Sequence, residues 1–206
     1  MSIVDTLHER AHRTFVFNRR RDRLVDVIDT YLPVGVSVLD IGCGNGEVGQ
    51  QLAMAGREVA GVETQQREQC AIPLAIYDGE QLPFATNSFD WAVIVDVLHH
   101  ASDPDQVISE ARRVARAGLV VKDHYAETAG QRFRLGVMDW VGNRHFGVGR
   151  DGHYLSRDEW ASLWNDQGMA VREVDEAIDL YPGLVKPLFE KGLHFVARIE
   201  PQDSSA

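Results

Sequence analysis

The sequence has few cysteines and no long apolar run, and these two absences exclude several classes of protein. Cys43 and Cys70 are the only cysteines among 206 residues, and they stand in unrelated contexts. Two such residues build neither a disulfide framework nor a typical zinc site. No stretch approaches the roughly 20 apolar residues that cross a bilayer, and the first residues lack the apolar segment of a signal peptide. We therefore expect a cytoplasmic protein that has no membrane partner.

Positive charge is also scarce. The chain has 21 Lys and Arg against 31 Asp and Glu, so its formal net charge is −10. A surface of this sign does not attract nucleic acid, and we expect a small molecule as the partner. The hydrophobic content of 44% is typical of a folded chain. The length suits a single α/β domain over residues 1–206, which leaves open whether the protein is a monomer or a homodimer.

What the chain does contain is a glycine-rich turn after an apolar run. The stretch Val38–Gly46 reads VLDIGCGNG, which predicts a buried strand followed by a turn whose glycines let a ligand approach the backbone. The amphipathic segment after it predicts a helix that ends at Gly56. In a parallel sheet, such a strand, loop and helix form a ligand site at the carboxyl ends of the strands.

Two cofactors fit such a loop, and Asp40 separates them. The segment Gly44–Gly49 satisfies the dinucleotide pattern G-x-G-x-x-G, and Glu63 follows at about the expected distance. A carboxylate at the mouth of the loop repels a pyrophosphate, whereas it attracts the amino group and the sulfonium of S-adenosylmethionine (SAM). The run therefore favours SAM over a dinucleotide, and a tight turn without a ligand is the third interpretation.

The order of the motifs resembles that of class I SAM-dependent methyltransferases. After the glycine loop come DGEQLPF at residues 78–84, SFD at 88–90, LHH at 98–100 and DP at 103–104. This succession is similar to the small-molecule, type 11 branch of the family, which includes the ubiquinone and menaquinone methyltransferases. The family usually has an R-P-G-G turn before the fifth strand, and residues 114–118 (VARAG) depart from it. That departure lies at a remote turn.

The resemblance implies both a fold and a cofactor site. The fold is a three-layer, Rossmann-like α/β methyltransferase fold, with a seven-stranded mixed sheet in the order 3-2-1-4-5-7-6 and helices on both faces. The cofactor is SAM, and its product is S-adenosylhomocysteine (SAH). In this family, the residue at the place of Glu63 binds the ribose hydroxyls, and the residue at the place of Asp78 binds the adenine amino group. The implied cofactor-binding residues are Asp40, Gly42, Gly44, Glu63, Asp78, Gly79 and Asp96.

Candidate catalytic residues lie in two segments that contain histidine. The run KDHY comes off the carboxyl end of a strand predicted over residues 118–122, where a doubly wound sheet holds its ligand. A histidine next to an aspartate suits proton abstraction, since its ordinary pKa is about 6.5. We predict His124 with Asp123 as the base, and His100 as the member of the His pair that contacts the acceptor. For each histidine, the alternative is a buried ring satisfied by the backbone.

Residues 123–155 are interpreted as an inserted lid or acceptor-site loop, and residues 1–34 as an N-terminal helical segment. The stretch over 126–155 shows no clear element, and loops of that length are usually functional. The predicted substrate-binding residues are Tyr125, Asp139, Trp140, His153 and Tyr154. An arginine run at residues 19–21 is either a solvated face or a source of one arginine for an anionic acceptor.

The sequence thus predicts SAM-dependent methyl transfer to a small organic acceptor, by in-line displacement with a base acting at O or N. No metal is predicted, because the leaving group is a neutral thioether and the histidines of residues 123–153 lack the compact spacing of known sites. Two alternatives stay open. One is a non-catalytic module that binds SAM as a structural or regulatory ligand, and the other is a dinucleotide-dependent oxidoreductase.

Overall fold

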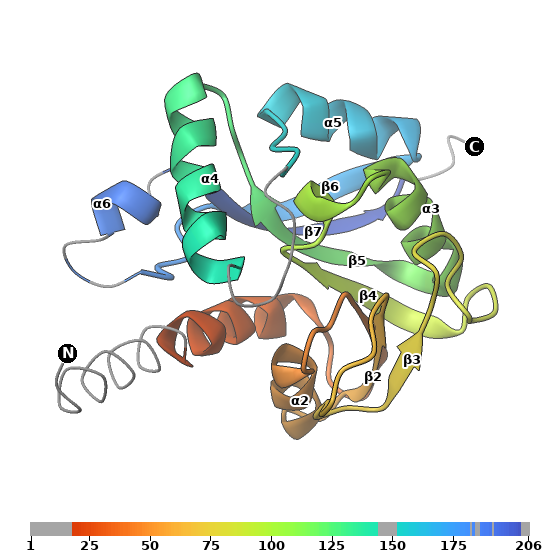
Figure 1. Cartoon of the computed structure of the whole chain (residues 1–206). Helices are drawn as coiled ribbons and strands as arrows, with labels where there is room; N and C mark the ends of the chain where they lie inside the picture. The colour runs from red at the N-terminus through yellow and green to blue at the C-terminus, as the bar shows by residue number, and fades with distance from the viewer. Residues whose placement is uncertain (1–17, 144–151, 182, 184–185, 191, 203–206) are drawn as a thin grey trace, which may run out of the picture.

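The computed structural model describes residues 18–143, 152–181, 183, 186–190 and 192–202. Within them, a seven-stranded sheet has the order β3-β2-β1-β4-β5-β7-β6 (Figure 1). The strands are β1 (Ser37–Ile41), β2 (Glu58–Glu63), β3 (Leu74–Ile76), β4 (Phe89–Val95), β5 (Ala115–His124), β6 (Met169–Asp175) and β7 (His194–Pro201). All pairs from β3 to β5 are parallel, and β7 is antiparallel to β5 and β6. The predicted fold and strand order are confirmed.

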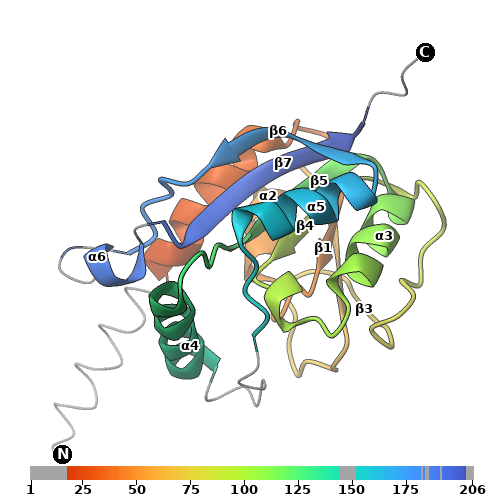
Figure 2. The ribbon, with the colours of Figure 1, turned by 90° about the horizontal axis from the view of Figure 1, so that it is seen from above.

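Helices cover both faces of the sheet (Figure 2). They are a helix over residues 18–31, called here the N-terminal helix, α2 (Glu47–Met54), the 3-10 helix η1 (Leu98–His100), α3 (Pro104–Val114), α4 (Ala129–Asn143), α5 (Arg157–Asp166) and α6 (Lys186–Phe189). Because side chains alternate along a strand, Val93 and Val120 pack under the N-terminal helix and α2, while Ala92 and Leu119 pack under α3 and α5. None of the described helices is long and apolar enough to cross a membrane.

The fifth strand is longer than predicted. It begins directly after α3 and continues to His124, with Asp123 opposite Phe195 and His124 opposite His194 of β7. The prediction that Asp123 and His124 leave the strand over 118–122 as a turn is therefore wrong, because pairing with β7 extends the strand. Both residues still lie at the carboxyl end of β5.

Helix α4 corrects the interpretation of residues 123–155 as a loop. It stands beyond the end of the sheet (Figure 1), where Leu135 is buried while Phe133 is 73% exposed. Because α4 buries only a small apolar surface, its apolar residues do not follow a clear helical period. The sequence therefore does not indicate this helix. The side chain of Trp140 lies outside the described residues, so its predicted role is not addressed.

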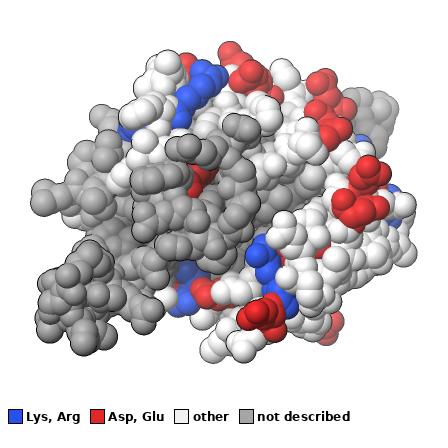
Figure 3. Space-filling model, in the orientation of Figure 1, with Lys and Arg blue, Asp and Glu red and all other residues white. Residues whose placement is uncertain are grey.

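Among the charged side chains seen in Figure 3, acidic ones are more prominent than basic ones. The acidic side chains gather over α5 and along the edge beyond α3, and basic side chains form only small groups on this face. This distribution agrees with the formal net charge of −10.

Candidate active site

The glycine loop joins β1 to α2 at the carboxyl edge of the sheet. Gly42, Gly44 and Gly46 have φ values of 69°, 58° and 76°, a left-handed conformation that favours glycine. A Cβ atom on Gly42 would lie 2.4 Å from Cγ2 of Val97, whereas one on Gly44 would meet nothing within 4 Å. Gly42 is thus required by packing, and Gly44 borders open space in which a ligand fits.

Asp40 lies in β1 and is 2% exposed. Burial raises the pKa of its carboxyl to about 7, and the charge of Glu63 adds to this effect, while a hydrogen bond from the Gly49 backbone opposes it. Its Oδ2 atom is buried and has no hydrogen-bond partner among the described residues. A buried carboxylate oxygen without a donor is stabilised by a cation, so this atom suits the positively charged end of SAM.

Glu63 ends the neighbouring strand β2 and faces the glycine loop. Its Oε1 atom accepts a hydrogen bond of 2.8 Å from the Gly44 amide, and Arg67 Nη2 lies 3.2 Å from the same atom. The Thr64 amide donates to Oε2 at 3.2 Å. The carboxylate therefore lies beside the loop, as its position at the end of the second strand implies, and ribose binding by this residue stays a prediction.

The predicted adenine-binding turn follows β3. Oδ1 of Asp78 accepts hydrogen bonds from the amides of Glu80 and Gln81 at 2.8 and 3.0 Å, and these bonds lower the pKa of Asp78. A Cβ atom on Gly79 would lie 3.6 Å from Cγ2 of Thr64, so this turn is next to the end of β2. The structure thus brings Asp78 and Gly79 to the same edge of the sheet as the glycine loop.

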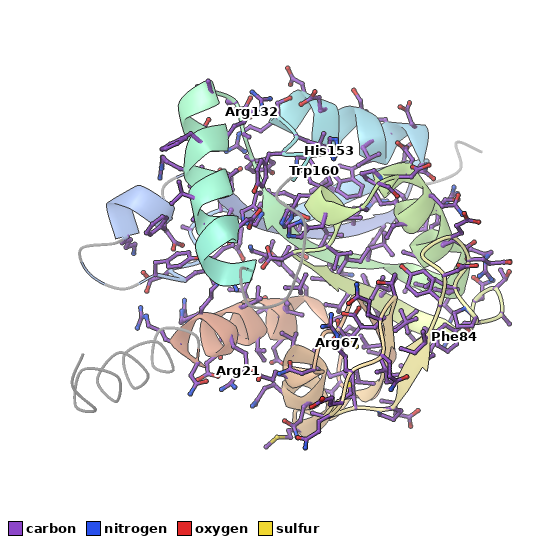
Figure 4. The ribbon with its side chains drawn as sticks, in the orientation of Figure 1. Arg21, Arg67, Phe84, Arg132, His153 and Trp160 are labelled. Atoms are coloured by element: carbon purple, nitrogen blue, oxygen red, sulfur yellow. The ribbon has the colours of Figure 1, made fainter. Side chains whose placement is uncertain are left out.

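A cavity of about 180 Å³ lies beside the glycine loop. Its lining residues are Arg20, Arg21, Leu24, Cys43, Asn45, Glu47, Val48 and Val95. Arg21 projects from the N-terminal helix on this side, and Arg67 lies near β2 (Figure 4). A larger groove of about 480 Å³ runs between α3 and α5 and includes His153. Of these two, only the smaller cavity contains residues of the glycine loop.

Asp96 follows β4 and is held by two cations. Lys122, fully buried at the end of β5, donates to Oδ1, and Arg20 of the N-terminal helix donates to Oδ2. Burial alone would raise the pKa of Asp96, but the charges of Lys122 and Arg20 hold it well below the usual range. The sequence analysis missed Lys122, although a lysine that ends an apolar strand is an unusual feature that could have indicated it. Contact of Asp96 with the cofactor stays a prediction.

His124 lies in the same buried group. Its Nδ1 atom is 3.1 Å from Oδ1 of Asp123, and its Nε2 atom is 3.4 Å from Nζ of Lys122. Burial and the charge of Lys122 lower the pKa of His124 to about 4. Both ring nitrogens have partners within the protein, and this arrangement gives little support to the prediction that His124 is the base.

His99 of η1 is the nearest histidine to Asp123, and the sequence analysis gave it no role. Its Nδ1 atom lies 2.7 Å from Oδ1 of Asp123, and its Nε2 atom is buried without a hydrogen-bond partner among the described residues. The carboxylate atom Oδ2 of Asp139 lies 3.7 Å from Nε2. The ring of His100 is 4.1 Å from that of His99 between centroids, and burial lowers the pKa of His100. His99, Asp123 and His124 thus form one buried cluster, called here the histidine group, and the ring of His100 lies beside it.

Residues from α4 and the segment after it lie over His99. Tyr154 donates its hydroxyl hydrogen to Asp139, and its ring stacks on His99 with centroids 5.5 Å apart. The His153 amide donates to the carbonyl of His99 at 2.7 Å, although its side chain is exposed. Asp139 and Tyr154 are therefore brought to the histidines, and substrate binding by these two residues stays a prediction.

Tyr125 and Trp160 lie on the core side of β5. Tyr125 stacks on Phe195 with centroids 4.5 Å apart, and Arg157 covers its ring. Trp160, labelled with His153 in Figure 4, donates its indole hydrogen to the carbonyl of His124 at 2.9 Å. The structure gives Tyr125 a packing position and does not bring it to the histidine group, so its predicted substrate contact gains no support.

Four possible metal ligands come together here, which the sequence spacing did not reveal. Ligand atoms of Asp96, His99, Asp123 and His124 lie within 4.8 Å of one another. The ammonium of Lys122 contacts both Asp96 and His124, so a positive charge is already present among them. This internal cation offsets part of the negative charge of the carboxylates. His99, His100 and Asp139 form a second group of possible metal ligands.

Comparisons with known proteins agree with this geometry. A family model described as a methyltransferase domain matches residues 39–121. An uncharacterized methyltransferase from Mycobacterium sp. (strain JLS) is 38% identical over 144 residues, which make up 64% of this chain and 57% of that relative. The chain thus spans little more than half the length of this curated relative.

Solved structures share the fold. A SAM-dependent methyltransferase from Thermotoga maritima, described as a possible histamine N-methyltransferase, has a TM-score of 0.64 and 20% identity, covering 94% of this chain and 96% of its own. A magnesium protoporphyrin IX methyltransferase from Synechocystis with bound SAH has a TM-score of 0.59 and 20% identity, covering 98% and 89%. The chain is thus similar to methyltransferases over residues 39–121, and its sheet order and these likenesses show that it has the fold of SAM-dependent methyltransferases.

Proposed function

We propose that the protein transfers the methyl group of SAM to a small organic acceptor. The observation that carries the proposal is the unpartnered Oδ2 atom of Asp40, which is buried beside a glycine loop whose Gly44 borders open space. A cationic ligand satisfies this oxygen, whereas the pyrophosphate of a dinucleotide would be repelled by it. Glu63 and Asp78 extend the same edge of the sheet toward the ribose and the adenine.

Positioning is the main task of these residues. When bound, SAM supplies a methyl group on a positively charged sulfur, which is already activated for transfer. Alignment of acceptor and methyl group contributes on the order of 7–11 kcal/mol, whereas a base contributes roughly 3–5 kcal/mol. Residues that hold the two molecules therefore matter more than the residue that takes the proton.

The acceptor is assigned to the ends of β4 and β5, beside the residues of α4 that approach His99. Residues 1–206 act as one domain in this proposal, in which residues 1–34 are the N-terminal helical segment and residues 123–155, with α4, cover the acceptor. Arg19 and Arg20, once candidates for an anionic acceptor, pair with Asp179 and Asp96. Their charges are thus matched within the protein, which favours an acceptor without a negative charge.

A binding experiment and a transfer experiment test the proposal. Calorimetry compares SAH with NADH, and we expect SAH to bind and NADH to give no heat. An assay with methyl-labelled SAM and fractionated metabolite extract should then yield a labelled small product, identified by its mass. Binding of NADH alone would contradict the cofactor assignment. Binding of SAH with no labelled product from any fraction would instead support the non-catalytic module.

A further inference from the structure

We propose that His99, held in place by Asp123, is the base that takes the proton from the acceptor, and that the acceptor presents an uncharged hydroxyl group to it. This inference rests on the function proposed above and deepens it. It also replaces His124, which the sequence favours, by a histidine from a different element.

The hydrogen bond to Asp123 decides which nitrogen of His99 is basic. Oδ1 of Asp123 is an acceptor 2.7 Å from Nδ1, so Nδ1 carries the hydrogen in the neutral ring. The lone pair of the ring is then on Nε2, which has no hydrogen-bond partner among the described residues. Asp123 itself is fully buried, and it therefore acts as a positioning residue.

The same argument removes His124 from this role. Its Nδ1 atom also faces Oδ1 of Asp123, at 3.1 Å, so its lone pair is likewise on Nε2. That atom lies 3.4 Å from the ammonium of Lys122, which donates to it, and 3.7 Å from Oδ1 of Asp96. The lone pair of His124 is therefore used inside the protein.

The surroundings of Nε2 of His99 define the acceptor group. Asp139 Oδ2 lies 3.7 Å away, and Tyr154 covers the ring face. A carboxylate or phosphate of the acceptor at this point would be repelled by Asp139, whereas a hydroxyl hydrogen would point at Nε2 without a charge conflict. A phenol or an alcohol therefore fits best.

The proposed step is balanced in atoms and electrons. The acceptor oxygen gives an electron pair to the methyl carbon, the bond between that carbon and sulfur breaks, and its pair stays on sulfur as a neutral thioether. The hydroxyl proton moves to Nε2 of His99, and the resulting imidazolium is stabilised through Nδ1 by Asp123. Solvent removes this proton after the products leave.

The charges around His99 support its basicity. Burial alone would lower the pKa of His99, but Asp123, Asp96 and Asp139 outweigh burial, and the pKa is raised above its ordinary value. The other ionisable groups close to the ring are His100, His124 and Tyr154. A base with a raised pKa accepts a proton more readily and is active once the pH exceeds that value.

The first test needs no acceptor. Nitrogen-15 NMR of the histidine rings in the SAH complex identifies the protonated nitrogen at alkaline pH. We expect the Nδ1–H form for His99, and a lower pKa for this ring in Asp123→Asn. A His99 ring with its hydrogen on Nε2 would overturn the proposal.

The second test compares His99→Gln with His124→Asn, using the metabolite fraction that gives labelled product. We expect His99→Gln to lower kcat by about 10²–10⁴-fold with SAH affinity unchanged, and His124→Asn, whose amide still donates to Asp123, to lower it less than tenfold. The SAH measurement shows that each variant is folded. Equal turnover in His99→Gln and wild type would remove His99 from the mechanism, while absence of SAH binding in the wild type would remove the proposed function instead.

Discussion

A single carboxyl group, that of Asp40, should make cofactor binding depend on pH. Burial raises its pKa to about 7, and binding of a cation requires the ionised form. We expect the affinity for SAM to be constant above pH of about 8 and to fall by up to tenfold per pH unit as the pH drops below about 7. Asp40→Asn should bind SAM more weakly and without this pH dependence. Calorimetry between about pH 5.5 and 8.5 measures the SAM affinity of the wild type and of the variant. A wild-type affinity that does not change with pH would remove Asp40 from the site.

Gly42 and Gly44 should differ in what an added methyl group disturbs. Both need a left-handed backbone, which costs a non-glycine residue about 1–2 kcal/mol. In Gly42→Ala, the methyl group also meets Val97, and this overlap adds about 1–3 kcal/mol of destabilisation. In Gly44→Ala, it enters open space, so the fold should persist while SAH binding is lost. Urea unfolding and calorimetry separate the two effects, and tight SAH binding by Gly44→Ala would show that the ligand does not occupy that space.

The proposed base shows how well single site residues can be predicted from the sequence. Asp123 is predicted as the partner of a catalytic histidine, and the structure places its carboxylate against the rings of both His99 and His124. The sequence favoured His124 because it is adjacent in the chain. The closer partner, His99, comes from η1 after the neighbouring strand β4, and a contact between strands has no local signal in the sequence. Lys122, which occupies the lone pair of His124, lies two residues away and was overlooked.

Among the elements, α4 should be able to loosen without affecting the cofactor site. Its buried residue Leu135 packs in a small cluster with Ala126 and Leu193, separate from the two large cores. Leu135→Ala removes apolar contact of the kind that contributes about 2–5 kcal/mol in a core, and we expect the loss to appear as local opening of α4. Hydrogen exchange should speed up in α4, acceptor turnover should fall, and SAH affinity should be unchanged.

Phe133 offers a matched control on the same helix. It is 73% exposed, so Phe133→Ala should leave exchange in α4 close to that of the wild type. Uniformly faster exchange across the sheet in Leu135→Ala would show that α4 is part of the global folding unit, and would contradict its role as a separately mobile cover.

Helix starts were easier to predict than helix partners. Asp103 caps α3 by accepting a hydrogen bond from the Gln106 amide at 3.0 Å, and Ser156 and Glu159, three residues apart, form a capping box at the start of α5. Asp103 and Gln106 also have the spacing of a capping box, but the Gln106 side chain donates to the carbonyl of Glu80 at 2.8 Å instead. A cap is local and follows from spacing alone, whereas Glu80 belongs to the turn after β3, whose proximity depends on the whole sheet.

At the scale of the whole molecule, the sheet order was predictable because it follows from the family motifs and the apolar strands. The central parallel strands β1, β4 and β5 are largely buried and contain apolar runs, which the sequence shows directly. The charged groups that are buried at the ends of β4, β5 and β7 were not predictable. Their burial depends on the antiparallel pairing of β7 with β5. Their titration should govern how the protein responds to acid.

Buried neutral histidines should make the fold unstable in acid. Burial lowers the pKa of His124 to about 4 and that of His194 well below the ordinary value of about 6.5. A group whose folded pKa is lowered takes up its proton more readily in the unfolded chain. The stability it contributes is complete above about pH 6.5 and is lost as the pH falls toward the folded pKa. For His124, the loss approaches about 3 kcal/mol near pH of about 4.

The variant His124→Asn isolates this contribution, because asparagine retains a donor for Asp123 and has no proton to gain. Urea unfolding at pH values between about 7 and 4.5 should show a shallower fall in the free energy of unfolding than the wild type. The carboxyl of Asp123, whose pKa is lowered, destabilises the fold only when the pH falls below the ordinary carboxyl range, so it does not obscure the comparison. Identical slopes in variant and wild type would mean that His124 has the same pKa in the folded and the unfolded chain, and its lone pair would then not be held by Lys122.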